Sequence, residues 1–437
     1  MSEILLNISR YILIFVMLFY VYFSFRIKEN RILNNLQNVF TAVIFTICSG
    51  IVLYHTQSLS FLVIILLEVI YMVATIALYR TIYPECSNLV LNNMIMLLAI
   101  GFIMSFRLAP GNALKQFIIV VMATIVSFFV PHIMKHKKFF VASRYVMAIV
   151  GILLLGITLI LGKTSFGANL SITVGFFSVQ PSEFVKLIYV LFVAGILSKK
   201  GFANVVGSAV FAALHVIVLI LSNDLGAGLI LFVVYVIMLF IATGKFRYLF
   251  AGLFAGCGAA VAAYNFVGHV KTRVVAWLDP WSVIDDKGYQ ITQSLFAIGT
   301  GGLFGIGLYE GLPTKIPVVA KDFVFAAIAE EFGLVFGICI ILVCFSSFIG
   351  IMRVATRVRD EFYKLIAVGF GVLYIFQCFL TIGGVIKFIP STGVTLPFVS
   401  YGGSSIVSSI IMFAIVQAVF ILDSETSDSL EETVNEA

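Results

Sequence analysis

Three carboxylates in the segment 267–322 could take part in chemistry: Asp279, Asp285 and Asp286. A carboxylate within hydrogen-bond reach of a hydroxyl group can act as a general base and take its proton. The alternative is that these residues are solvated charges of a loop. Asp279 has a further structural explanation, because it precedes Pro280 and Asp-Pro favours a turn. The residue types alone leave both interpretations open.

Basic side chains in the same segment could bind a phosphate group. Arg273 presents a forked pair of donors that matches phosphate geometry, and Lys315 adds a second positive charge. Lysines scattered through a loop usually only face water, which makes Lys271, Lys287 and Lys321 less specific candidates. The glycines between 299 and 307 do not form a phosphate-binding loop, since no G-K-[ST] follows and no strand precedes them.

An apolar side on the segment 289–308 favours a half-buried, re-entrant or interfacial element. Its apolar residues are Ile291, Leu295, Phe296, Ile298 and Leu303.

A polar stretch rich in glycine and proline, residues 390–405, lies between two long apolar runs. At a membrane boundary its backbone groups need water or protein partners, so we expect it to line a cavity or to pack into the protein. The simpler alternative is a tight loop between two helices.

The elements that must position these residues are membrane-spanning helices. The chain has 437 residues, of which 61% are hydrophobic and 11% charged, with a mean hydropathy of +1.13. A soluble domain cannot bury that much apolar surface. Apolar runs of roughly 17–25 residues predict about thirteen spans, at 11–27, 38–54, 59–79, 89–107, 114–133, 144–162, 183–198, 204–221, 224–243, 248–266, 323–349, 365–387 and 402–421.

The basic residues predict the orientation of these spans. Short loops on alternate sides differ in charge: one side carries Lys and Arg, for example Lys135, Lys137 and Lys138, whereas the loop 55–58 on the other side has none. By the positive-inside rule the N-terminus lies outside and the C-terminus inside. The net charge of +6 therefore reflects topology rather than nucleic-acid binding, and the long loop 267–322 is extracytoplasmic. The six cysteines show no C-x-x-C spacing and fit small hydrophobic residues.

Several motifs of this sequence resemble, in order, those of the shape, elongation, division and sporulation (SEDS) family, which includes RodA, FtsW and SpoVE. They are residues 180–187 (QPSEFVKL), 223–226 (NDLG), 273–281 (RVVAWLDPW), 288–294 (GYQITQS), 322–326 (DFVFA), 330–333 (EEFG) and 390–405. The resemblance implies an all-α polytopic membrane protein with a ten-helix SEDS-like core at 85–422. Residues 1–84 then form an N-terminal extension of about three transmembrane helices, which we expect to be dispensable for the fold of the core. The acidic tail 423–437 is predicted to be disordered and cytoplasmic.

The resemblance implies polymerisation of lipid II into glycan strands at the outer face of the cytoplasmic membrane, in partnership with a class B penicillin-binding protein. It implies no certain cofactor, although a divalent cation could stabilise the departing pyrophosphate. The substrate-binding candidates are Arg273, Lys315, Lys186, Glu183, Asp322, Glu330, Ser400, Gly402 and Gly403. Lys186 and Lys387 are candidate partners for the carboxylates Glu330 and Glu331, which would otherwise be costly at membrane depth.

The sequence departs from the family at one position that matters for catalysis. A loop carboxylate that is thought essential in the family follows the Pro-Trp pair by two residues, and here that position is Val283. Valine can neither accept a proton nor bind a cation. We expect Asp285 to substitute, followed by Asp286 and Asp279, because a shift of two extended residues spans only about 6–7 Å.

Two other functions stay open. A flippase or transporter for a lipid-linked precursor would also use intramembrane carboxylates and a polar loop. A catalytically impaired scaffold for the penicillin-binding protein would explain Val283. The sequence does not distinguish a role in elongation, division or sporulation.

Overall fold

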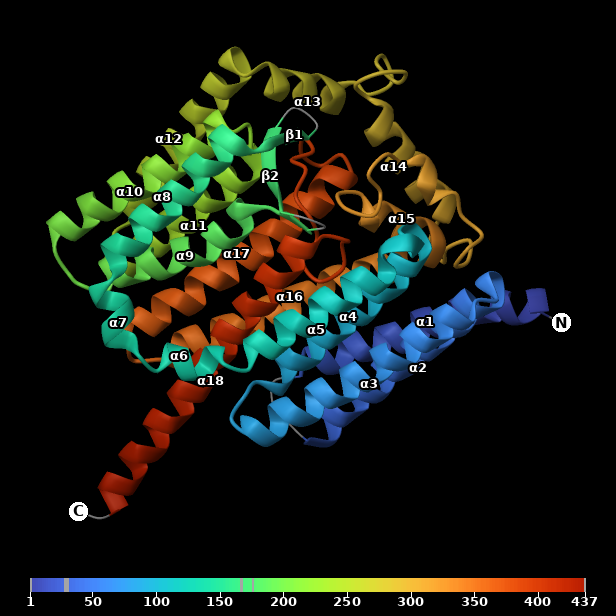
Figure 1. Cartoon of the computed structure of the whole chain (residues 1–437), viewed down its shortest axis with the longest axis horizontal. Helices are drawn as coiled ribbons and strands as arrows, with labels where there is room; N and C mark the ends of the chain where they lie inside the picture. The colour runs from blue at the N-terminus through green and yellow to red at the C-terminus, as the bar shows by residue number, and fades with distance from the viewer. Residues whose placement is uncertain (1, 27–30, 166–167, 175–176, 436–437) are drawn as a thin grey trace. The chain divides into compact units, whose positions relative to one another are not determined.

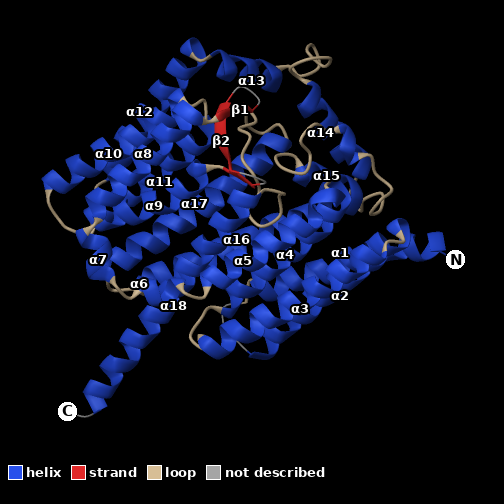
Figure 2. Cartoon of the chain, in the orientation of Figure 1, coloured by secondary structure: helices blue, strands red, loops and turns tan. Residues whose placement is uncertain are grey.

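The computed structural model describes residues 2–26, 31–165, 168–174 and 177–435, and these residues are mainly helical (Figures 1 and 2). Within them, twelve helices are long and apolar enough to cross a membrane. The predicted span 183–198 is also a helix, α9 (Pro181–Leu197), although it has only 17 residues. The predicted all-α polytopic membrane fold is therefore confirmed.

The chain divides into two compact units, each assembled from segments that are distant in sequence. The first comprises Met1–Ile125, Val275–Gly350 and Cys378–Gly402. Its elements are α1 (Ser2–Ser24), α2 (Arg31–Thr56), α3 (Leu59–Ile82), α4 (Asn88–Leu108), the 3-10 turn η1 (Pro110–Asn112), most of α5 (Ala113–Ser127), α14 (Tyr289–Gly301), the 3-10 turn η2 (Pro313–Lys315), α15 (Val324–Phe332) and most of α16 (Leu334–Arg357).

The second unit comprises Val126–Val274, Ile351–Gln377 and Gly403–Ala437. Its elements are α6 (Val130–Met134), α7 (Lys137–Ala142), α8 (Arg144–Leu161), β1 (Lys163–Ser165), β2 (Ala168–Val174), β3 (Phe177–Val179), α9, α10 (Phe202–Leu221), α11 (Leu225–Thr243), α12 (Phe246–Phe266) and α18 (Gly403–Asn435). Two further helices, α13 (Gly268–Leu278) and α17 (Glu361–Val385), contribute residues to both units.

The fully buried helix α4 organises the first unit, and α2 and α3 pack against it (Figure 1). Two amides on α4, those of Asn92 and Asn93, are completely buried and find partners on the N-terminal helices. Asn92 Nδ2 donates to Gln37 Oε1 at 3.0 Å, and Tyr20 donates to Asn93 Oδ1 at 3.0 Å. Residues 1–84 thus share one compact unit with α4, and their dispensability for the fold of the core stays a prediction.

We expect Gln37→Leu to destabilise the protein by about 1–3 kcal/mol, because it removes an acceptor from the buried Asn92 amide. The thermal midpoint in detergent would measure this, with Val39→Ala on the exposed side of α2 as the control. Equal stability of the two variants would favour the prediction that residues 1–84 are an extension independent of the core.

The predicted span 323–349 is wrong as a single helix. It is broken at Gly333, whose φ of +89° favours glycine, into α15 and α16. The loop after α14 fills the break: the N–H groups of Ile306 and Gly307 donate to the carbonyls of Glu330 and Glu331. The N–H groups of Leu334 and Val335 donate in turn to the carbonyls of Gly302 and Leu303. Non-helical backbone is thereby satisfied inside the protein, as a membrane environment requires.

The two backbone segments at this break approach each other closely, and this depends on two glycines. A Cβ added to Gly305 would lie 2.4 Å from the carbonyl oxygen of Glu331, and one added to Gly333 would lie 2.3 Å from the Gly305 nitrogen. No other residue fits at either position without a backbone shift. The predicted re-entrant segment 289–308 therefore consists of α14 followed by this inserted loop, with Ile291 buried but Phe296 and Leu303 exposed.

The buried helix α9 lies at the centre of the second unit and contacts α8, α10, α11 and α18. A small antiparallel sheet of order β1-β2-β3, which was not predicted, precedes it (Figure 2). Thr164 pairs with Asn169 and Ile172 pairs with Val179. The run Ile172-Thr173-Val174 suits a strand because it is β-branched throughout, but it is too short to stand out between two spans.

The last helix, α18, continues through Asn435, and the disorder of the acidic tail 423–437 stays a prediction. Extending an existing helix costs much less than nucleating a new one, so a spanning helix can continue into a polar segment.

Candidate functional site

A buried ion pair lies near the beginning of α9 in the second unit. Lys186 Nζ donates to Glu183 Oε1 at 2.9 Å, and their side chains are 3% and 8% exposed. Lys186 also donates to Gln377 Oε1 at 2.9 Å, and the Ser408 hydroxyl donates to Glu183 Oε2 at 2.8 Å. Three helices, α9, α17 and α18, are thus joined by one satisfied polar network. Lys186 is engaged here, so its predicted role as a partner of Glu330 or Glu331 is wrong.

A further hydrogen-bonded pair, Ser182 and Asp224, lies at the N-terminal end of α9. The Ser182 hydroxyl donates to Asp224 Oδ2 at 2.9 Å, and Asp224 caps α11 by accepting from the Ala227 N–H. Burial raises the pKa of the Asp224 carboxyl, while these two hydrogen bonds oppose the shift. The backbone N–H of Gln180 donates to Ser404 at the start of α18. The 180–187 motif therefore holds the N-terminal ends of α9, α11 and α18 together.

A second buried ion pair lies in the first unit, at the break between α15 and α16. Arg107 Nε donates to Glu331 Oε1 at 2.7 Å, and the side chains are 12% and 0% exposed. A second guanidinium nitrogen of Arg107 donates to the Gly311 carbonyl at 2.8 Å. Glu330 Oε1 accepts from the Leu312 N–H at 3.1 Å. The two carboxylates therefore bind the loop that leads to Lys315, and neither has the lysine partner that was predicted.

Aromatic side chains and the N-terminal helices extend this cluster. The Arg107 guanidinium lies over the Tyr309 ring at 4.8 Å, and the His55 ring stacks on Tyr309 at 4.9 Å. From α1, Arg10 donates to the Gly305 carbonyl at 3.0 Å. We define the clamp as Arg10, His55, Arg107, Tyr309 and Glu331. The clamp fixes the segment 302–312 between helices that belong to the N-terminal extension and to the core.

The three candidate carboxylates lie on a short loop that is anchored on both sides. Before it, Trp277 Nε1 donates to the Lys387 carbonyl at 3.1 Å. After it, the Ser294 hydroxyl donates to the Val385 carbonyl at 2.9 Å. Both flanks of the loop are thus attached to the end of α17.

Within this loop, Asp279 shapes a turn, as predicted, because its carboxylate accepts from the Ser282 N–H. The Gly288 N–H donates to the Val283 carbonyl at 2.8 Å, and a Cβ on Gly288 would lie 2.3 Å from the Pro280 carbonyl oxygen. Gly288 therefore fixes a tight turn between Pro280 and α14, and the two-residue shift that would bring Asp285 to the position of Val283 stays a prediction. Asp285 and Asp286 are exposed on the loop, while Val283 is half-buried.

The basic candidates lie on flanking elements. Arg273 is half-buried on α13, about one and a half turns before Asp279, and Lys315 is exposed at the end of η2. Asp322 is half-buried just before α15. No group of three or more His, Cys, Asp or Glu side chains suited to a metal ion occurs within the described residues. The divalent cation stays a prediction.

The segment 390–405 packs into the protein as expected. The buried Ser400 hydroxyl accepts from the Leu396 N–H and donates to the Lys321 carbonyl, so it holds two loops together. Gly101 on α4 permits this packing, because a Cβ there would lie 2.3 Å from the Phe398 carbonyl oxygen. Gly402 directly precedes α18, and the last three residues of the segment, from Gly403 on, form the start of that helix. Ser400 therefore forms internal hydrogen bonds, and its contact with substrate stays a prediction.

Sequence reasoning missed Arg107, Tyr309 and His55. An arginine in the last turn of a largely apolar helix was the available signal for Arg107, but its partner is 224 residues away in sequence.

A family model described as cell cycle protein (FtsW, RodA, SpoVE) matches residues 86–424. The chain belongs to this family. The helices α1–α3 precede the matched region, so the SEDS core begins near α4. The chain is 35% identical over 296 residues to the peptidoglycan glycosyltransferase RodA of Mycobacterium tuberculosis (strain ATCC 25618 / H37Rv), covering 63% of each chain. It therefore spans less than two thirds of that relative.

Other members of the SEDS family are also similar to this chain. The probable peptidoglycan glycosyltransferase FtsW of Aliivibrio salmonicida is 32% identical over 353 residues, covering 77% of this chain and 87% of the relative. Among solved structures, a chain of a peptidoglycan synthase complex aligns with a TM-score of 0.66 at 23% identity, over 77% of this chain and 98% of the other. RodA of Thermus thermophilus aligns with a TM-score of 0.58 at 23% identity, over 77% and 96%. The ten-helix architecture is thus a SEDS fold.

Proposed function

We propose that this SEDS protein is a peptidoglycan glycosyltransferase that polymerises lipid II into glycan strands at the outer face of the cytoplasmic membrane. The observation that carries the proposal is the match of the SEDS family model across 86–424. The carboxylate loop 279–288, anchored on both flanks to the end of α17, supplies acid–base groups on a supported element. Rigid support of this kind is what positioning a general base requires.

Each part of the reaction has candidate residues. Asp285 takes the proton of the acceptor hydroxyl, with Asp286 and then Asp279 as the next candidates. Arg273 and Lys315 stabilise the charge that develops on the pyrophosphate leaving group. The clamp holds the segment 302–312 that leads directly to Lys315. The polyprenyl tail of the substrate stays in the bilayer, alongside the apolar faces of the spans.

The partner in this proposal is a class B penicillin-binding protein, a transpeptidase that cross-links the new strands. One structural relative comes from a peptidoglycan synthase complex that coordinates polymerisation and crosslinking. The relatives include two proteins named as peptidoglycan glycosyltransferases, RodA and FtsW, and one named stage V sporulation protein E, so a role in shape, division or sporulation fits the proposal.

Polymerisation of purified lipid II by the purified protein, with and without this partner, tests the proposal. Glycan chains longer than one disaccharide support it. Absence of any chain growth in both preparations, for a protein that is folded, overturns it.

Val283 favours a second candidate, a non-catalytic scaffold for the penicillin-binding protein, because no carboxylate occupies that position. The buried Glu183–Lys186 pair favours a third, a flippase for the lipid-linked precursor, because transporters place paired charges within the membrane. Movement of lipid II across vesicles without chain growth would select the flippase. Binding to the partner without either activity would select the scaffold.

The orientation follows from the asymmetry of the basic residues and makes a direct prediction. Because Cys257 is an exposed cysteine, labelling starts from a Cys257→Ser background. In that background, Ser282→Cys should react with a membrane-impermeant reagent in intact cells, while Thr356→Cys should react only after the cells are opened. Both positions are exposed in the structure. Labelling of Thr356→Cys in intact cells would reverse the topology and remove the outer-face site.

A further inference from the structure

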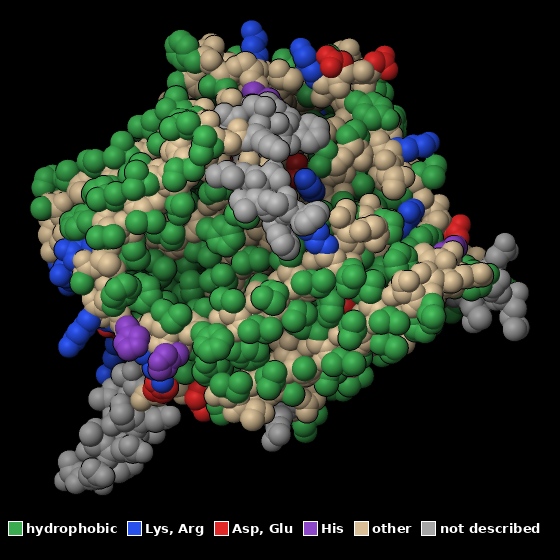
Figure 3. Space-filling view, in the orientation of Figure 1, with side chains coloured by type: hydrophobic (Ala, Val, Ile, Leu, Met, Phe, Trp, Pro, Cys, Tyr) green, Lys and Arg blue, Asp and Glu red, His purple; other side chains and the backbone are tan. Residues whose placement is uncertain are grey.

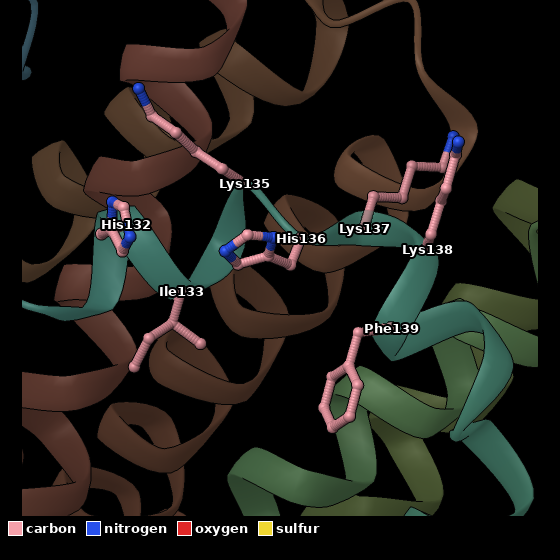
Figure 4. A pocket seen from close by; sticks show the side chains of 7 residues that line it. All are labelled: His132, Ile133, Lys135, His136, Lys137, Lys138 and Phe139. Carbon is pink, nitrogen blue, oxygen red and sulfur yellow. The ribbon is translucent and has the colours of Figure 1, made fainter.

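A basic pocket lies in the connection between α5 and α8, outside the site described above. The short helix α6 ends the candidate membrane span Pro110–Met134, and the short helix α7 follows it. The cavity has a volume of about 800 Å³ and is lined by His132, Ile133, Lys135, His136, Lys137, Lys138 and Phe139 (Figure 4). Lysine and histidine side chains gather at this place on the surface (Figure 3). We call these seven residues the α6–α7 pocket.

The side chains of the α6–α7 pocket separate by polarity. In Figure 4, Ile133 and Phe139 point to the side opposite that of Lys135, Lys137 and Lys138. Ile133 is 51% exposed and Phe139 is 66% exposed, although both are apolar. Amines on one side and uncovered apolar groups on the other are typical of an element at the membrane interface.

Two lysines of the pocket have carboxylate partners, and one does not. Lys135 Nζ lies 2.6 Å from Glu425 Oε1 on α18, and Lys137 pairs with Asp360. No carboxylate in the described part of the chain lies within ion-pair distance of Lys138. All of these pairs are partly exposed, so an anion from solvent or membrane could replace a carboxylate. The α6–α7 pocket therefore has one lysine, Lys138, without a counter-charge in the described part of the chain. A second lysine, Lys135, has a carboxylate partner that an anion can displace.

We infer that the α6–α7 pocket binds the phosphate-bearing headgroup of an anionic phospholipid. The lysines would contact the phosphate, and Ile133 and Phe139 would contact the acyl chains beside it. A free phosphate would satisfy the lysines but would leave both apolar side chains in water. A lipid accounts for the apolar side chains as well as for the lysines. Anionic lipids recruit juxtamembrane lysines in this way.

The acidic end of α18 would compete with the lipid. Glu425 occupies Lys135, and the segment 423–437 carries six acidic residues and no basic ones. A headgroup that binds Lys135 must displace Glu425. The C-terminal helix would thus set how tightly the pocket holds its lipid.

Binding of phosphatidylglycerol and of phosphatidylcholine to the full-length protein, measured by native mass spectrometry or lipid-fluorescence titration in detergent, tests the inference. We expect phosphatidylglycerol to bind more tightly. A Lys135→Ala, Lys138→Ala double variant should lose about 20- to 30-fold in affinity, at about fivefold per lysine. Glu425→Gln should gain about fivefold by releasing Lys135.

The matched control is a Lys199→Ala, Lys200→Ala double variant, which removes an exposed lysine pair outside the α6–α7 pocket. It should bind phosphatidylglycerol as the wild type does. Equal loss in the two double variants, or equal affinity for the two lipids, would overturn the inference. Complete displacement of the lipid by millimolar inorganic phosphate or glycerol phosphate would also overturn it, in favour of a site for soluble anions.

Discussion

Asp285→Ala should lower the rate of lipid II polymerisation by about 10²–10⁴-fold, the usual cost of losing a general base. The loop that carries Asp285 is anchored by Trp277 and Ser294, so the substitution removes a proton acceptor from a supported position. Asp285 is exposed, so the variant should express and fold as the wild type does. Chain growth by the purified protein with its penicillin-binding partner would measure the effect, and Asp286→Ala in the same assay would test the second candidate.

Val283→Asp is the complementary variant, since it places a carboxylate at the position where the SEDS family has one. It should restore or raise polymerisation if the rest of the site is preserved. Normal chain growth in both Asp285→Ala and Asp286→Ala would show that the residue assignment is wrong, while the family function would stand. An inactive wild type together with an active Val283→Asp would instead select the scaffold.

Arg107→Ala should destabilise the protein by about 3–5 kcal/mol, because it leaves the fully buried Glu331 carboxylate without its counter-charge. Thermal unfolding in detergent would measure this. Hydrogen exchange across 302–316 should also become faster, since the Arg107 bond to the Gly311 carbonyl is lost. Lys135→Ala breaks an exposed ion pair and provides the control, with an expected effect of about 0–1 kcal/mol.

A second variant separates the charge effect from simple loss of packing. Arg107→Met with Glu331→Leu removes both charges and should be less destabilised than Arg107→Ala alone, because no buried charge is left unpaired. If the single and double variants are equally unstable, the ion pair is not what holds the clamp together.

The spans could be predicted from sequence because the bilayer imposes a length and a hydropathy on each helix, regardless of its neighbours. The partners of buried charges could not. Glu331 and Arg107 lie far apart along the chain, and hydropathy gives no information on which buried charges meet. Lysines inside or beside apolar runs, such as Lys186, were plausible partners, but Lys186 is held by Glu183 and Gln377.

A prediction from sequence succeeded where its signal was local and failed where it depended on a distant contact. Asp279 was expected to form a turn, and its bond to the Ser282 N–H agrees, because Asp-Pro is a short-range signal. The break at Gly333 was missed because an apolar run looks continuous whether or not its backbone is interrupted. Only the inserted loop at Gly305 reveals the break, and that contact joins residues from different parts of the sequence.

The inserted loop has a consequence for biosynthesis. Residues 302–307 leave the ribosome before α15 and α16, so their carbonyl and N–H groups cannot bond to residues 330–335 until that later stretch has been made. Exposure of such groups to lipid costs several kcal/mol each. The segment from α14 to the start of α16 must therefore wait at the translocon or the interface and enter the bilayer as one unit. A stall in translation shortly after residue 310 would leave the part of this segment already made outside the bilayer.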